Sequence, residues 1–177
     1  INNGVKTGIR FTLNGVNQKE LPGIFELVEK EKIPRFCIYH LVYAGRGQEM
    51  MEMDTTPAEK RAIIEYICRK TLELHQKGIE TEILTTDNHA DGIFLYQFAK
   101  DHSQQPPDEV LRLLELHGGC SAGTKFANVD PIGNVHPCQF WQDYTIGNIR
   151  EQPFSQIWNG PDELLVKLRE KEKYLQG

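Results

Sequence analysis

Hydrophobic residues recur with two different periods along the first half of the chain. Runs rich in β-branched and aromatic residues predict three strands, in residues 5–13, 35–43 and 79–85. Apolar residues at helical spacing predict two helices between them, in residues 21–33 and 57–77. Because strands that alternate with helices form right-handed βαβ units, we expect a parallel sheet with helices packed on one side.

Two capping patterns mark where these helices begin. Thr56, Pro57 and Glu59 have the spacing of a capping box with proline in the first turn, so the second helix is predicted to begin at Pro57. Asn17 and Glu20 repeat the spacing of the box and could cap the first helix, whereas Pro22 would place its start later.

The spacing of hydrophobic residues changes in the second half of the chain. Helical spacing returns in residues 91–102 and 108–117, in a short segment at 154–158 and in a terminal segment from Pro161. Residues 125–138 alternate with a period of two around Asp130-Pro131-Ile132-Gly133, a composition typical of a type I turn, which predicts a β-hairpin. We therefore expect an α/β domain in residues 1–110 and a small α+β module in residues 111–177.

Composition limits what this protein binds. The chain has 20 basic and 25 acidic residues, for a net charge of −5, and no basic block, so no nucleic-acid partner is expected. No apolar run approaches the roughly 18 residues of a membrane-spanning helix, so no membrane partner is expected. Four cysteines are too few for a secreted disulfide scaffold, and we expect a cytoplasmic protein with cysteines for metal or redox chemistry.

Two of the cysteines bracket the predicted hairpin. Cys120 and Cys138 are arranged as C-x12-G-x4-C, with Gly133 in the turn. A hairpin brings its ends together, so both thiolates would reach one metal ion or iron–sulfur cluster. Two buried cysteines that pack as small hydrophobic residues are the other interpretation, and the spacing alone leaves both open.

The cysteine spacing resembles the opening motif of the SPASM domain, the auxiliary-cluster module of radical S-adenosylmethionine enzymes. Residues 147–158 are similar to the segment that commonly follows that hairpin, through Gly147-Asn148-Ile149-Arg150-Glu151, Pro153-Phe154 and Ile157-Trp158. Three further segments resemble the radical enzymes of heme d1 and alternative heme biosynthesis, which remove side chains from didecarboxysiroheme: YHLVYAGRG (39–47), TTDNHADG (85–92) and NVHPCQFW (134–141).

This resemblance implies a fold and an activity. Residues 1–110 would be the C-terminal half of a partial (β/α)6 radical enzyme barrel, and residues 111–177 the N-terminal part of a SPASM-like module. The intact enzyme would use a 4Fe–4S cluster and S-adenosylmethionine and would draw electrons from a reductant protein. It would act on a tetrapyrrole, either by deacetylating didecarboxysiroheme or by removing propionate groups as in heme d1 formation. Cys120 and Cys138 would supply part of the ligands of an auxiliary cluster.

Two cysteine motifs of that family do not occur in these 177 residues. The CxxxCxxC motif, which binds the catalytic cluster, is expected to precede Ile1 in a longer protein. A C-x2-C run is expected after the terminal helix. The chain by itself is therefore expected to be inactive.

Polar residues near the predicted strand ends are candidates for ligand binding. In β/α barrels, functional groups gather at the C-terminal strand ends and in the loops that follow. His40, Arg46 and His89 lie there, and they are predicted to bind the carboxylate side chains of the substrate, with Arg46 as a bidentate partner. By resemblance, Arg10 and Asn14 would approach the ribose or carboxylate of the cofactor. A satisfied buried histidine and solvated surface residues are the alternative interpretation.

Other reactive residues have simpler explanations. The loop DNHAD (87–91) has the ligands of a hard metal site, yet such residues also form ordinary turns, and substrate contact is favoured. Cys37 and Cys68 are expected to pack in the core, because free cysteine is among the most buried residue types. His136 is expected to be structural rather than a cluster ligand. Three aromatic residues are expected in the core of the small module: Phe140, Trp141 and Trp158.

Two other functions remain open at this point. A radical enzyme of the same kind could modify a peptide, although no segment here resembles the winged-helix region that binds peptides in such enzymes. A non-catalytic module could instead hold zinc through Cys120, Cys138 and either His117 or His136. An iron–sulfur protein is brown and a zinc protein is colourless, so the colour of the purified protein distinguishes these functions.

Overall fold

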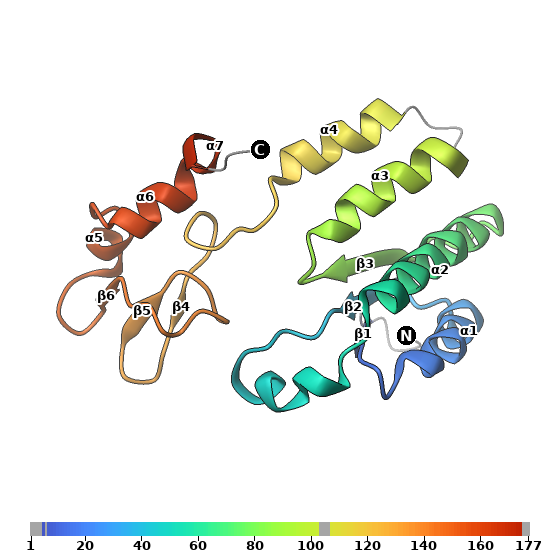
Figure 1. Ribbon diagram of the computed structural model, residues 1–177, viewed down its shortest axis with the longest axis horizontal. Coiled ribbons are helices and arrows are strands. Elements are labelled where there is room, and N and C mark those ends of the chain that lie inside the picture. Colours follow the sequence, from blue (N-terminus) through green and yellow to red (C-terminus); the bar gives the residue numbers. More distant parts are fainter. Residues whose placement is uncertain (1–4, 6, 103–106, 175–177) are drawn as a thin grey trace. The chain divides into compact units, whose positions relative to one another are not determined.

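The computed structural model describes residues 5, 7–102 and 107–174, and the chain falls into two units, residues 1–117 and 118–177 (Figure 1). The first unit contains β1 (Ile9–Thr12), η1 (Gln18–Glu20), α1 (Leu21–Glu31), β2 (Arg35–Tyr39), η2 (Gly45–Met53), α2 (Pro57–Gln76), β3 (Glu82–Thr86), α3 (Ala90–His102) and α4 (Pro107–His117). The second contains β4 (Asn128–Val129), β5 (Asn134–His136), β6 (Gly147–Asn148), α5 (Phe154–Trp158), α6 (Glu163–Arg169) and α7 (Lys171–Tyr174).

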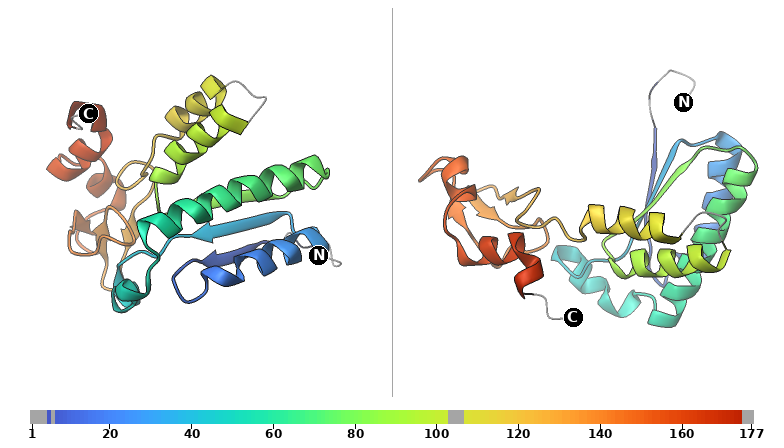
Figure 2. Two further views of the ribbon diagram at one scale, coloured as in Figure 1. Left: turned by 45° about the vertical axis from the view of Figure 1, so that its right-hand side comes forward. Right: turned by 90° about the horizontal axis from the view of Figure 1, so that it is seen from above.

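The sheet of the first unit has three parallel strands in the order β1-β2-β3. In register, Ile9 of β1 faces Phe36 of β2, and Phe36 faces Ile83 of β3. Helices α1 and α2 run beside the sheet (Figure 2). The predicted parallel strand–helix alternation is therefore confirmed.

The strands are shorter than the hydrophobic runs that predicted them. β1 begins at Ile9, and Lys6 of the expected strand lies outside the described residues. β2 ends at Tyr39 instead of continuing to Tyr43, because its neighbour β3 ends at Thr86. The amide of His40 donates the last hydrogen bond of the ladder, at 3.1 Å, to the carbonyl of Thr86.

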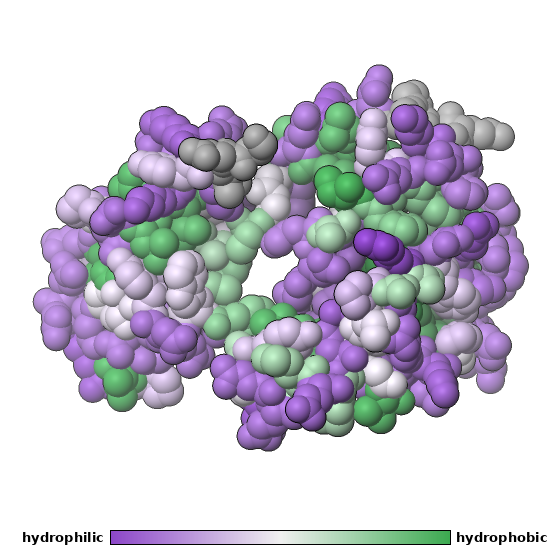
Figure 3. Space-filling model, viewed as in Figure 1, coloured by the Kyte–Doolittle hydropathy of each residue, from purple (hydrophilic) through white to green (hydrophobic). Residues whose placement is uncertain are grey.

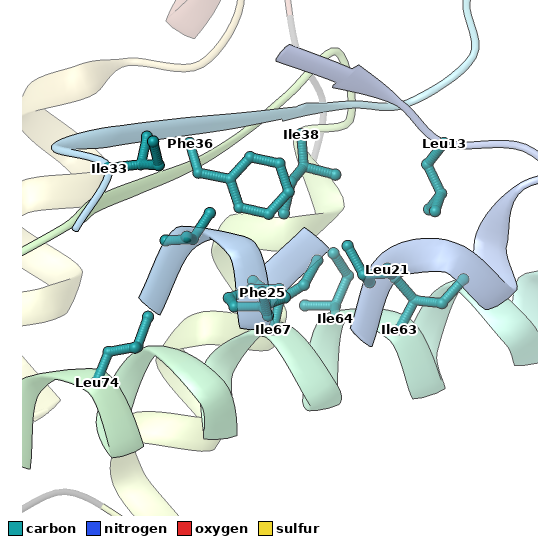
Figure 4. Packing of buried hydrophobic residues seen from close by; sticks show 11 residues of the cluster. Leu13, Leu21, Phe25, Ile33, Phe36, Ile38, Ile63, Ile64, Ile67 and Leu74 are labelled. Carbon is teal, nitrogen blue, oxygen red and sulfur yellow. The ribbon is translucent and has the colours of Figure 1, made fainter. Parts of the chain in front are cut away.

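The hydrophobic core lies between this sheet and its helices. Phe36 and Ile38 point from β2 toward α1 and α2 (Figure 4) and are fully buried. The Phe36 ring meets Phe25 of α1 edge to face, with centroids 5.3 Å apart. Burial of each such side chain contributes about 1.5–3 kcal/mol, so this layer holds the helices against the sheet. Ile64 and Ile67 of α2 complete it.

The other face of the sheet lies away from this core, and its central-strand side chains, Cys37 and Tyr39, are half-buried, so it is called the open face here. Successive side chains of a strand alternate between faces, so the partners of Phe36 and Ile38 share the core side and the residues between them point away. Two registered rows therefore lie on the open face: Arg10, Cys37 and Leu84, and Thr12, Tyr39 and Thr86.

One of the two predicted caps is present. The Thr56 hydroxyl accepts a hydrogen bond from the amide of Glu59, and the Glu59 carboxylate accepts one from the amide of Thr56, so the capping box of α2 is confirmed. The predicted cap at Asn17 is wrong. Its side chain instead accepts from the amide of Asn14 and donates to the carbonyl of Thr12, which holds the turn between β1 and α1.

Helices α3 and α4 carry apolar side chains on the surface of the first unit. Ile93, Leu113 and Leu116 are 60%, 57% and 71% exposed, and apolar residues appear here among polar ones (Figure 3). None of the helices in the described ranges is long and apolar enough to span a membrane.

The second unit is a β-hairpin extended by a third short strand. β4 pairs with β5, and β5 with β6, all antiparallel. The amide of Gly133 donates to the carbonyl of Asp130 at 3.0 Å, so the predicted hairpin and its turn are confirmed. β6 was not predicted, and the expected terminal helix is interrupted at Glu170 between α6 and α7.

The segment that follows the hairpin packs back onto it. The Asn148 side chain donates to the carbonyl of Ile132 and to the Asn134 side chain, which fastens β6 to the turn. Gly147 has φ +156°, and a Cβ there would lie 3.0 Å from the buried side chain of Ile157. A larger residue at Gly147 would push α5 away, which explains the glycine physically.

Candidate functional site

His40 and Asp91 form a buried pair that joins the end of β2 to the first turn of α3. His40 follows the last residue of β2, and its Nε2 lies 2.7 Å from Oδ2 of Asp91 in the first turn of α3. The exposed fractions of the two side chains are 3% and 9%. Nδ1 of His40 is buried and has no hydrogen-bond partner in the described residues. Asp91 therefore holds His40 through one ring nitrogen, Nε2.

The loop between β3 and α3 presents His89. Asp87 has φ +69°, a left-handed conformation that aspartate adopts more readily than most residues. Asn88 accepts from the amide of Ala90 and donates to Oδ1 of Asp91 at 3.0 Å, so it starts the helix and braces the buried pair. His89 is exposed. In the described part of the chain, no three histidine, cysteine or acidic side chains are grouped closely enough to hold a metal ion.

Arg46 lies in the 3-10 helix η2, after the end of β2. Its side chain is exposed, and no hydrogen bond or ion pair joins it to His40 or His89 within the described ranges. The amide of Gly47 donates to the carbonyl of Ala44 at 3.0 Å, and at the far end of η2 the carbonyl of Met53 accepts from the amide of Gly15 at 2.7 Å. The guanidinium is thus presented to solvent from a fixed loop.

A buried carboxylate closes the base of this loop. The side chain of Asp54 is 5% exposed and accepts hydrogen bonds from Tyr43, Lys60 and the amide of Thr55. Burial by itself would raise the pKa of Asp54, but these bonds outweigh it and leave the pKa below its usual value. The sequence contained no signal for this cluster, because its members are brought together only when the η2 segment folds back.

Arg10 and Asn14 have different surroundings. Arg10 is exposed on the open face of the sheet, with its guanidinium carbon 5.1 Å from the centre of the Tyr39 ring. Asn14 is buried, and its Oδ1 accepts hydrogen bonds from the amides of Val16 and Asn17 at 2.9 and 3.2 Å. Arg10 is available to a ligand, whereas Asn14 shapes the loop that leaves β1.

The two cysteines of the first unit differ. Cys68 packs against the hydrophobic core, and burial, followed by the charges of Asp91 and Glu65, raises the pKa of its thiol to about 11. Core packing is thus confirmed for Cys68. Cys37 is half-buried in β2 and lies on the open face, so the expected core position is wrong for it. Alternation along the strand places its neighbours, and not Cys37, in the core.

Cys120 and Cys138 lie at the two ends of the hairpin in the second unit. Both are free thiols, Cys120 exposed and Cys138 half-buried. The amide of Gly123 donates to the carbonyl of Pro137 at 2.9 Å, which ties the segment after Cys120 to the residue before Cys138.

Each of these sulfur atoms accepts a backbone hydrogen bond from the residue two positions later. Ala122 N lies 3.5 Å from Sγ of Cys120, and Phe140 N lies 3.4 Å from Sγ of Cys138. Amide donors directed at sulfur are typical of cysteines that hold iron–sulfur clusters. The donor set therefore fits such a cluster.

His136 is structural, as expected. Its Nδ1 lies 2.8 Å from the carbonyl of Tyr144, and its Nε2 lies 3.4 Å from Asp130. Both ring nitrogens are occupied, so the histidine holds the hairpin.

The expected aromatic core of this unit is wrong in part. Phe140 and Trp141 are 41% and 39% exposed, whereas Trp158 is half-buried against Phe154 and Arg169. The buried positions are instead taken by aliphatic side chains: Ala122, Val135, Ile157 and Leu165.

Residues 120–176 match the family model of the SPASM iron–sulfur cluster-binding domain. The chain is 44% identical over 98% of its length to Fe-coproporphyrin III synthase of Methanosarcina barkeri. It is 36% identical over 98% of its length to pre-heme d1 synthase of Dinoroseobacter shibae. It spans 44% of the length of each of these relatives.

The fold is also similar to a solved structure, that of SuiB from Streptococcus suis bound to its precursor peptide SuiA. The TM-score is 0.63 over 94% of this chain and 36% of that one, with 17% sequence identity. At that identity the likeness concerns the fold alone. Residues 120–176 therefore match the SPASM iron–sulfur cluster-binding domain, and nearly all of the chain is similar to part of two tetrapyrrole synthases.

Proposed function

We propose that the intact protein removes side chains from an iron tetrapyrrole in heme biosynthesis. The observation that carries this proposal is the similarity, along 98% of the chain, to relatives named for Fe-coproporphyrin III and pre-heme d1. Of the two reactions, deacetylation of didecarboxysiroheme is favoured over propionate removal, because the identity is 44% to the first relative and 36% to the second.

The first unit would be the C-terminal half of a partial (β/α)6 barrel, with the open face of its sheet toward the lumen. Three parallel strands with helices on one side support this assignment. The open face carries Arg10 over Tyr39, and Arg10 would reach the carboxylate or ribose of S-adenosylmethionine. Asn14 would act on the same cofactor through the shape of the loop after β1.

The substrate would be bound at the C-terminal ends of β2 and β3. Arg46 and His89 are exposed there and would meet the carboxylate side chains of the macrocycle, Arg46 as a bidentate partner. His40 would offer its unpartnered Nδ1, with Asp91 holding the ring in place. These groups bind and orient the substrate, and S-adenosylmethionine on the catalytic cluster supplies the radical that starts the reaction.

Cys120 and Cys138 would supply part of the ligands of an auxiliary 4Fe–4S cluster. Their amide-to-sulfur hydrogen bonds support this, because such bonds stabilise cluster-bound thiolates. The remaining ligands would come from outside these two positions. When bound, the cluster provides a one-electron redox centre or helps to bind the substrate, with electrons from a reductant protein.

The reaction is tested with the full-length protein under anaerobic conditions. Purified enzyme with a reconstituted catalytic cluster is incubated with dithionite, S-adenosylmethionine and didecarboxysiroheme, and the products are analysed by mass spectrometry. Loss of acetate side chains is expected. Loss of propionate side chains instead would support the heme d1 type of reaction, and a tetrapyrrole left unchanged would contradict the proposal.

The auxiliary cluster is tested by metal content. Cys138→Ser in the full-length protein is expected to lower the iron per chain and to weaken the brown absorbance. Cys37→Ser is the matched control, because Cys37 is half-buried in another unit, and its iron content is expected to stay unchanged. Zinc in place of iron, with a colourless protein, would favour a zinc-stabilised module.

A further inference from the structure

The last two helices are joined to the Cys120 loop by two cationic side chains. Lys171 of α7 donates from Nζ to the carbonyl of Cys120, across 51 positions of sequence. Arg169 of α6 donates from Nε to the carbonyl of Gly123 at 3.1 Å. Both contacts lie within the second unit, and they bring two positive charges to the loop that carries the first cysteine.

Arg169 is held in a fixed position. Its Nη2 donates to the carbonyl of Trp158 at 2.7 Å, and its guanidinium carbon lies 4.7 Å from the centre of the Trp158 ring. The planar guanidinium thus lies beside the Trp158 ring and donates two hydrogen bonds, to the carbonyls of Gly123 and Trp158. These contacts fix α6 against the loop. Lys171 follows two residues later and reaches the backbone of Cys120 itself.

The neighbouring acidic side chain is paired elsewhere. Glu170, between the two cations, forms an ion pair of 2.9 Å with Lys173. Lys173 is mostly exposed, at 68% of its side chain, and its ion-pair partner is Glu170, not a group of the cysteine loop. The charges of Arg169 and Lys171 at the loop are therefore not cancelled by Glu170.

A positive charge beside a cluster ligand changes the redox equilibrium of the cluster. Reduction adds one electron to a cluster that already carries thiolate charge, so a nearby cation stabilises the reduced form more than the oxidised form. The reduction potential of iron–sulfur clusters responds to net charge, to hydrogen bonds on sulfur and to solvent exposure. The hydrogen bonds that backbone amides donate to both sulfur atoms also favour the reduced form of the cluster, as the cation does.

We propose that Lys171 is a positioning residue that raises the reduction potential of the auxiliary cluster through its charge at Cys120. The inference rests on the proposed function, because it requires the cluster at Cys120 and Cys138. In the redox step one electron passes from the reductant to the cluster, and no covalent bond forms or breaks. Lys171 holds the Cys120 backbone while its charge favours the reduced state.

The experiment compares two substitutions on the same helix in the full-length, reconstituted protein. Lys171→Gln and Lys173→Gln remove the same charge, but Lys171 contacts the carbonyl of Cys120 whereas Lys173 pairs with Glu170. The midpoint potential is measured by anaerobic redox titration with dithionite, followed by electron paramagnetic resonance. The signal of the auxiliary cluster is the one that Cys138→Ser abolishes.

For Lys171→Gln we expect the ratio of reduced to oxidised cluster at a fixed potential to fall about tenfold, which is about 59 mV for one electron. Lys173→Gln should shift the potential by less than half as much, and Lys171→Arg should leave it near that of the unchanged protein. Equal shifts for Lys171→Gln and Lys173→Gln would overturn the role of Lys171.

Two further outcomes are informative. A shift for Lys171→Arg as large as that for Lys171→Gln would overturn the role of charge, even if the helix had moved, because arginine keeps the charge. If no signal depends on Cys138, the auxiliary cluster of the proposed function fails as well, and the two failures are thereby distinguished. Iron per chain is measured for every variant, so that loss of the cluster is not mistaken for a shift in its potential.

Discussion

Nε2 of His40 lies 2.7 Å from Oδ2 of Asp91, and both side chains are buried. The pair connects the end of β2 to the first turn of α3. The Asp91 carboxylate is an acceptor when ionised, so the facing Nε2 carries the proton. Asn88 donates to the other oxygen of Asp91, and this completes a chain of three side chains beneath the loop that presents His89.

Breaking this pair should destabilise the protein. In Asp91→Asn the amide has fewer acceptor positions for His40 and Asn88, and the free energy of unfolding is expected to fall by about 1–3 kcal/mol. Urea unfolding of the full-length protein measures the change. Asp87→Asn is the matched control on the same exposed loop, and it is expected to change the stability by less than about 0.5 kcal/mol. Equal losses would show that the buried pair is not what stabilises this region.

The thiol of Cys68 should react slowly in the folded protein. Burial raises its pKa from 9.0 to about 11, so the thiolate fraction at pH 8 falls roughly a hundredfold. Labelling by iodoacetamide should therefore speed up about tenfold per pH unit until the pH nears 11. Mass spectrometry of peptides from native and urea-unfolded protein measures the rates. A native rate equal to the unfolded rate at pH 8 would contradict the burial of Cys68.

Arg46→Ala should weaken the binding of the tetrapyrrole to the full-length protein. Loss of a desolvated bidentate pair costs about 1.5–3 kcal/mol, or roughly 10- to 150-fold in Kd. Arg46→Lys should restore the affinity only in part, because the fork geometry is lost. The control is Arg35→Ala, an exposed arginine at the opposite end of β2. Absorbance titration gives the dissociation constants, and identical values for Arg46→Ala and Arg35→Ala would rule out Arg46 as a substrate clamp.

The hydrogen-bonded carboxylate of Asp54 should make the free energy of unfolding depend on pH. The pKa of Asp54 is lower in the folded protein than the usual 3.8, so its stabilising effect is present above about pH 4 and is lost as the pH falls through the folded value. In Asp54→Asn this acid dependence should become shallower, because the titrating group is gone. Thermal unfolding between pH 3 and about 6 measures it. Asp108→Asn on α4 is the exposed control, and a slope unchanged by Asp54→Asn would refute the prediction.

Interactions between residues close in sequence could be predicted directly. The capping box of Thr56 and Glu59 spans three positions, and the hairpin turn from Asp130 to Gly133 spans the same distance. Their geometry is set by the backbone conformation of a few residues, so composition and spacing are sufficient. The parallel order of the strands followed from the alternation with helices, which leaves few chain paths.

The sequence predicted which residues form the candidate sites, but it did not predict how these residues are arranged in space. The sequence placed His40 near a strand end and Cys120 and Cys138 at the ends of a hairpin. It did not indicate that β2 stops at Tyr39, since that depends on where β3 ends. Cys37 was misplaced for a related reason, because the face of a strand that enters the core depends on the helices that cover it.

Local chemistry was enough to predict α1 and α2, the hairpin and the spacing of its flanking cysteines. Tertiary structure alone decided the pairs that join distant segments: His40 with Asp91, across 51 positions, and Lys171 with Cys120, across the same separation. Such contacts form only after strand register and helix packing are set by many weak interactions spread over the core. No short stretch of sequence contains all of these interactions. The partners of the functional residues can therefore be identified only in the folded chain.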